Sequence, residues 1–84
     1  MKEIAAALVE ALDIERAGDW QGAHEAVQKL DGSAAAWVHA YLHRREGDIA
    51  NARYWYNRAG REPSEAPLAE EWAEIRRQLA AAAA

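Results

Sequence analysis

The sequence predicts an all-α fold in which two helix-turn-helix units stack on each other and a C-terminal helix closes the stack. The chain is rich in alanine and contains no Phe, Thr or Cys, a composition typical of helices that pack closely across small side chains. Apolar residues recur at helical spacing in five segments, and we find no strand pattern. A glycine-aspartate pair occurs twice, at Gly18-Asp19 and 29 residues later at Gly47-Asp48, which indicates an internal repeat.

The 84 residues are expected to form one domain, 1–84. A chain of this length buries only about 60 to 65% of the surface that it exposes when unfolded, so its core is thin. We divide it into a first helical hairpin at residues 4–31, a second at 33–60 and a capping helix at 64–80.

The first hairpin contains helices predicted at 3–17 and 20–30. Gly18 suits the left-handed residue that ends a helix, and Asp19 suits the N-cap of the next one. A tight turn between the two helices follows. Their buried stripes are Ile4, Leu8, Val9, Ala11 and Leu12 in the first and Trp20, Ala23, Ala26, Val27 and Leu30 in the second.

The second hairpin repeats this device. Ser33 is predicted to cap a helix at about 34–46, and Gly47 and Asp48 repeat the stop and the cap before a helix that ends at Gly60. The residues predicted to face inward on this last helix are Ile49, Ala52, Trp55, Tyr56 and Ala59, with Tyr54 left outside.

The fifth helix is expected to start in the turn marked by Pro63, Ser64 and Pro67, since proline is tolerated in a first helical turn. Its single apolar stripe suits a terminal cap on a repeat stack, or else pairs two copies of the chain as a homo-oligomer. The final alanines, 80–84, are expected to fray because nothing packs on them. The stripe consists of Leu68, Trp72, Ile75 and Leu79.

With these positions assigned, the chain resembles the tetratricopeptide and Sel1-like class of helical repeats over about residues 4–60. The Sel1-like pattern is carried by Ala40, Tyr41, Gly47, Ala52, Trp55, Tyr56, Ala59 and Gly60. Asn51 replaces that pattern's lysine, and the 29-residue offset is shorter than the ~34 of tetratricopeptides. The resemblance implies an α-α superhelix of two TPR-like units that binds a protein or peptide along its first-type helices.

In this register, the groove-facing side of the third helix carries Trp37, Tyr41, Arg44 and Arg45. Aromatic and arginine side chains supply most binding hot spots, so we expect these four residues to contact an acidic or aromatic peptide. The alternative is that Trp37 and Tyr41 pack against the fifth helix as part of the core, since a small protein needs its aromatic residues for burial.

Three histidines allow another function. His39 and His43 share a helix face at i, i+4 spacing, and His24 lies on the preceding helix, so the three are candidate ligands for a metal or a small molecule. Ala40 follows His39, which rules out the HExxH zinc motif. The alternative is structural, with the imidazoles turned into the hairpin and donating to Asn51, Tyr54 or backbone carbonyls.

Other classes of function are disfavoured. A net charge of −4 argues against a nucleic-acid or membrane-surface role, and adjacent aromatics at 54–56 point about 100° apart on a helix, so they cannot form one stacking platform. The apolar run at 4–9 is too short for a membrane span or a signal peptide. A cysteine-free chain of this kind is expected to be cytoplasmic.

Catalysis has few candidate groups. Ser33 and Ser64 resemble helix caps, and the only acid-base set is Asp48 with His43 and His39. We therefore expect a non-catalytic interaction scaffold without a cofactor.

Overall fold

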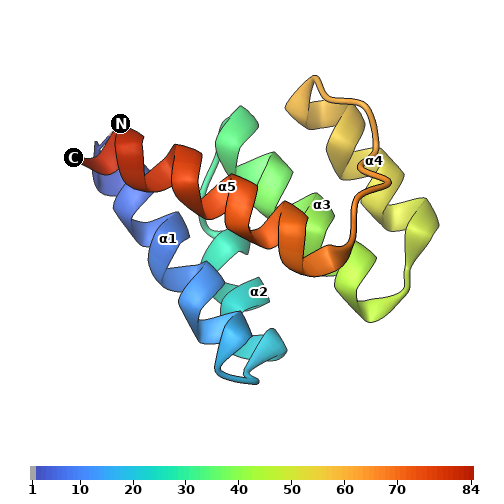
Figure 1. Ribbon diagram of the computed structural model, residues 1–84, viewed down its shortest axis with the longest axis horizontal. Coiled ribbons are helices and arrows are strands. Elements are labelled where there is room, and N and C mark those ends of the chain that lie inside the picture. The colour runs from blue at the N-terminus through green and yellow to red at the C-terminus, as the bar shows by residue number, and fades with distance from the viewer. Residues whose placement is uncertain (1) are drawn as a thin grey trace.

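Five α-helices make up the computed structural model, which describes residues 2–84 (Figure 1). No strand occurs in this range. Met1, which the predicted domain includes, lies outside it. The helices are α1 (Lys2–Arg16), α2 (Trp20–Gln28), α3 (Ser33–Glu46), α4 (Ile49–Ala59) and α5 (Leu68–Ala83).

Two helical hairpins, α1–α2 and α3–α4, are closed by the same turn chemistry. Gly18 and Gly47 adopt positive φ angles of 103° and 90°, which a residue with a side chain avoids. Asp19 then accepts a hydrogen bond from the Gly22 amide (2.8 Å), and Asp48 accepts one from the Asn51 amide. Both aspartates are therefore N-caps, and the predicted helix stop and N-cap at each of the two turns are confirmed.

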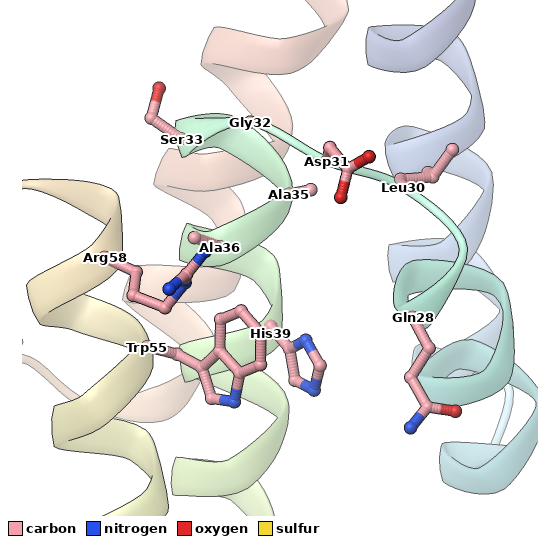
Figure 2. Close-up of a pocket in the computed structure, with 10 residues that line it drawn as sticks. All are labelled: Gln28, Leu30, Asp31, Gly32, Ser33, Ala35, Ala36, His39, Trp55 and Arg58. Atoms are coloured by element: carbon pink, nitrogen blue, oxygen red, sulfur yellow. The ribbon is translucent and has the colours of Figure 1, made fainter.

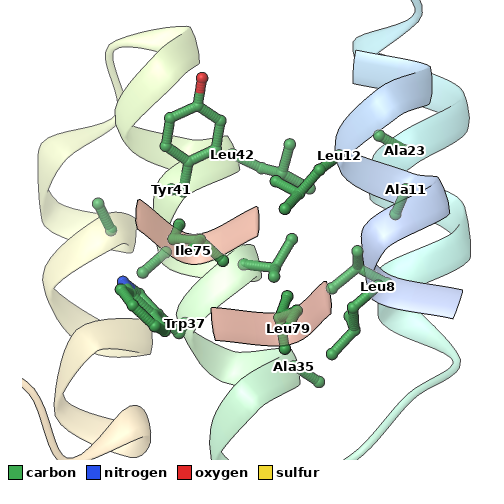
Figure 3. Close-up of a cluster of buried hydrophobic side chains, with 14 of the residues drawn as sticks. Leu8, Ala11, Leu12, Ala23, Ala35, Trp37, Tyr41, Leu42, Ile75 and Leu79 are labelled. Carbon is green, nitrogen blue, oxygen red and sulfur yellow. The ribbon is translucent and has the colours of Figure 1, made fainter. Parts of the chain in front are cut away.

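α5 returns across the two hairpins and packs on both α1 and α3 (Figure 1). Ile75 and Leu79 are buried between α1 side chains on one side and α3 side chains on the other (Figure 3). The Trp72 indole donates to the Leu12 carbonyl at 3.1 Å, which links α5 to α1. The core is one cluster to which every helix contributes, and its fully buried large side chains are Leu8, Leu12, Val27, Val38, Leu42, Tyr56 and Ile75.

Two predicted helix starts are wrong, and local backbone geometry explains where α5 starts. α3 begins at Ser33 itself, with Gly32 as its N-cap and no side-chain cap. α5 begins at Leu68 rather than 64, because a residue before proline avoids the helical region and Ala66 precedes Pro67. The Ser64 hydroxyl instead accepts from the Ala66 amide at 3.2 Å, within the connecting turn.

Two predicted helix ends also differ. α2 stops at Gln28, two residues earlier than expected. α5 stays helical to Ala83, although the last alanines were expected to fray. The high helix propensity of alanine is enough to continue the helix through these residues, because the preceding turns of α5 are already held by its packed face.

α2 and α4 do not pack against each other. They lie on either side of α3, and the space between them contains the site described below. Ile49, predicted to be inside, is instead 50% exposed at the start of α4. Tyr54 is 53% exposed, as predicted. None of the helices in residues 2–84 has the length and apolar character needed to cross a membrane.

Candidate metal and ligand site

The three histidines meet where α2 faces α3. His39 and His43 lie one turn apart on α3 with their rings stacked (centroids 5.0 Å apart), and His24 approaches both from α2 with its ring nearly perpendicular to theirs. The Nε2 atoms of His24 and His39 are 3.1 Å apart. One ligand nitrogen from each of the three rings lies within 4.8 Å of the other two.

Two tryptophans hold the rings in place. The Trp20 ring stacks on His24 (4.8 Å, 12°), and the Trp55 ring stacks on His39 (3.9 Å, 9°). Trp20 is itself fixed, since its indole nitrogen donates to the Leu42 carbonyl at 2.7 Å. Side chains held in this way lose little conformational freedom when they bind a ligand, so the cluster is preorganised.

A carboxylate orients His43. Nδ1 of His43 lies 2.7 Å from Oε2 of Glu46, one turn further along α3. An ionised carboxylate only accepts, so Nδ1 carries a proton, and in the neutral ring the Nε2 lone pair is left available. A carboxylate behind a histidine in this manner is the usual second partner of a metal-bound imidazole. The Asp48 carboxylate lies beside Glu46, on the exposed side of His43.

Burial disfavours the protonated forms of His39 and His24. It lowers the pKa of His39 to about 4, with the neighbouring His24 and His43 adding to the shift. The pKa of His24 is also lowered, first by desolvation and then by His43. At pH 7 these two rings are therefore unprotonated, the form in which imidazole binds a metal.

A cavity of about 450 Å³ opens beside His39, between α2 and α4 and above the first half of α3 (Figure 2). The Trp55 and His39 rings lie together on one side of it, and Gln28 of α2 lies across from them. The other lining residues are Leu30, Asp31, Gly32, Ser33, Ala35, Ala36 and Arg58.

The predicted partner-binding residues lie elsewhere, on the face of α3 that α1 and α5 cover. Trp37 and Tyr41 are only 6% and 3% exposed. The Trp37 indole donates to Glu71 of α5 at 3.2 Å, and the Tyr41 hydroxyl donates to Glu15 of α1 at 3.4 Å. Their burial therefore matches the alternative, in which both aromatic residues are part of the core.

The two arginines of that set are held by the same carboxylates. Arg44 donates to Glu71 at 2.8 Å and to the Ala66 carbonyl, and Arg45 donates to Glu15 at 3.2 Å. Arg45 alone among the four predicted contact residues has a largely exposed side chain. The face of α3 that was expected to line a binding groove is thus covered by the chain's own first and last helices.

The apolar stripe of α5 is likewise used within the chain. Ile75 and Leu79 are buried, and Leu68 and Trp72 are half-buried against the core. A homo-oligomer through α5 would therefore have to use another face of that helix.

The histidine partners differ from those expected. His39 stacks on Trp55 of its own hairpin, but His39 and His43 both turn towards His24 of the first hairpin. His24 and Glu46 take the place of the expected partners Asn51, Tyr54 and backbone carbonyls. The i, i+3 spacing of His43 and Glu46 and the i, i+4 spacing of Trp20 and His24 were visible in the sequence as same-face pairs. The stacking of Trp55 on His39 depends on how α4 packs on α3 and has no local signal.

Fold and site together define an all-α protein with a preorganised three-histidine cluster at the edge of a cavity. No protein-family model, curated protein or solved structure compared with this chain matches it.

Proposed function

We propose that the protein binds a divalent transition-metal ion through His24, His39 and His43. The observation that supports this most strongly is the convergence of three imidazoles from two helices. In a tetrahedral site with Zn–N bonds of 2.0–2.1 Å, two ligand nitrogens lie about 3.3 Å apart. The 3.1 Å between the Nε2 atoms of His24 and His39 fits such a pair without backbone movement.

Imidazole ligands suit Zn²⁺, Ni²⁺ and Cu²⁺ rather than Mg²⁺ or Ca²⁺, which prefer oxygen. Glu46 is engaged with His43 and acts behind the ligand rather than as one. Three protein ligands leave a fourth position for water or an added ligand, as in zinc sites that exchange ligands.

The ion would also join the two hairpins. His24 belongs to the first hairpin, and His39 and His43 belong to the second. Because only the folded chain brings these rings together, metal binding adds to the free energy of unfolding. In a domain of 84 residues with a thin core, such a link contributes a larger share of the total free energy of unfolding than it would in a large domain.

The test uses protein purified without a histidine tag. Elemental analysis is expected to find one ion per chain after loading with Zn²⁺ or Ni²⁺ and desalting, and the melting temperature is expected to rise on loading. His24→Gln should abolish both effects, while Gln28→Ala, a neighbouring change on the cavity wall, should preserve them. No bound ion and no melting shift in the native sequence would refute the proposal.

We propose a protein-interaction role second, in a cytoplasmic TPR-like scaffold of the kind that the sequence resembles. The repeated turns at Gly18 and Gly47 support the repeat interpretation. The exposed side chains of Ile49 and Tyr54 on α4 favour a contact surface there. If Ile49→Ser and Tyr54→Ser together leave the recovery of every co-purifying protein unchanged, this role is excluded for α4.

A further inference from the structure

We infer that the fourth position of the proposed metal site takes a carboxylate, and that Arg58 pairs with the same ligand. The inference rests on the proposed function. It assigns the class of ligand as a small monocarboxylate.

The cavity brings His39, one of the three proposed ligands, and Arg58 around one space. His39 lines the cavity, and Trp55, stacked on His39, lines it next to Arg58 (Figure 2). A volume of about 450 Å³ suits a small organic molecule. A ligand that enters this space therefore meets the edge of the metal site and the guanidinium together.

Arg58 is available for an anion. Its guanidinium lies 5.6 Å from the Trp55 ring centre and 5.8 Å from that of Tyr54, and it donates to the Tyr54 hydroxyl at 3.4 Å. No carboxylate in residues 2–84 forms an ion pair with it, whereas Arg44 and Arg45 each have one. The planar guanidinium matches a carboxylate with two parallel hydrogen bonds.

The remaining lining limits the ligand. Asp31 lines the cavity from the α2–α3 connection, so a polyanion would be repelled on that side, and a single negative charge directed at the ion and Arg58 fits better. Leu30, Ala35 and Ala36 add a smaller amount of apolar surface to the lining. A small monocarboxylate fits this lining.

The experiment uses the Co²⁺-loaded protein, because the visible absorption of Co²⁺ reports changes in its ligands. Benzoate is titrated in, with benzamide as the neutral probe of the same shape. A saturable spectral change with benzoate and none with benzamide is expected. No change with benzoate, or an equal change with benzamide, would overturn the inference.

Two arginines of α4 provide the variant and its control. Arg58→Gln should weaken benzoate binding about tenfold or more, the usual scale for losing a charge-assisted pair, while Arg58→Lys should restore part of it. Arg53→Gln, on the same helix but away from the cavity, should have no effect. Equal benzoate affinity in Arg58→Gln and the native protein would remove Arg58 from the site.

The same titration separates failure of the two proposals. If Co²⁺ does not bind, the metal site itself fails. If Arg58→Gln and Arg53→Gln bind Co²⁺ with native affinity, but benzoate does not change the Co²⁺ absorption of the native protein, only the carboxylate inference fails. Acetyl-alanyl-alanine tests the other source of a carboxylate, a peptide C-terminus; saturation by this peptide but not by benzoate would overturn the assignment to a small free acid.

Discussion

Nε2 of His24 lies 3.1 Å from Nε2 of His39, although the two residues belong to different helical hairpins. The contact needs one proton between two lone pairs, so one ring donates and the other accepts. An ion in place of that proton would bind both nitrogens and the His43 ring at once. This geometry makes the site a stronger functional candidate than any surface on the groove side of α3.

Glu46→Gln is expected to weaken metal binding about 10- to 100-fold, the usual effect of removing the carboxylate behind a ligating histidine. The amide binds the His43 Nδ1 proton less strongly and no longer fixes its tautomer. Competition with a chelating dye would measure the change. Glu10→Gln, an exposed change of the same charge on α1, should leave affinity unchanged, and an unaltered affinity in Glu46→Gln would deny Glu46 this role.

The metal-free protein should lose stability as the pH falls from 6.5 towards 4. In the folded state the pKa of His39 is lowered to about 4, while in the unfolded chain it is near 6.5. Between these values the unfolded state binds more protons, so the free energy of unfolding rises with pH across the window and is lost on acidification. His24 and His43 face His39, and the lowered pKa of His24 adds to the curve in the same direction.

Urea denaturation in the presence of EDTA, at several pH values from 7.5 to 4.5, measures this slope. His39→Gln should show a shallower dependence, whatever its stability at pH 7.5. An identical slope in the two proteins would show that His39 is not the group responsible.

Glu71→Ala should destabilise the fold by on the order of 3 kcal/mol, the cost of leaving a buried charge unpaired. Glu71 is 4% exposed, and it accepts from the Tyr56 hydroxyl (2.6 Å), the Trp37 indole and the Arg44 guanidinium. Its loss removes the acceptor of the Tyr56 hydroxyl and the Trp37 indole and leaves Arg44 with the Ala66 carbonyl alone. The urea midpoint should fall sharply, and Glu70→Ala, on the exposed side of α5, should leave it nearly unchanged.

Asp48→Ala should cost about 1 kcal/mol, because the Asp48 carboxylate caps α4. Ser33→Ala should change stability by less than about 0.5 kcal/mol, because the serine hydroxyl does not cap α3. Thermal denaturation distinguishes the two. A cost for Ser33→Ala equal to that of Asp48→Ala would mean that Ser33 acts as a cap in solution.

Much of the local structure could be predicted because it depends on neighbours in the chain. Gly18 and Gly47 end helices since only glycine enters the left-handed region freely, and Asp19 and Asp48 cap the next helices by reaching three residues ahead. The start of α5 was misplaced because two prolines near each other permit more than one helix start, and the restriction on Ala66 decided between them.

By itself, then, the sequence determined five helices, two similar turns and an imidazole pair on one face of α3, all of which follow from helical periodicity and short-range hydrogen bonds. Tertiary structure alone decided what covers each face. Trp37 and Tyr41 have the same sequence pattern whether a partner or the chain's own α1 and α5 buries them, and α5 and α1 do so here. It likewise brought His24 to His39, because contacts between separate hairpins depend on how the helices pack and not on spacing along the chain.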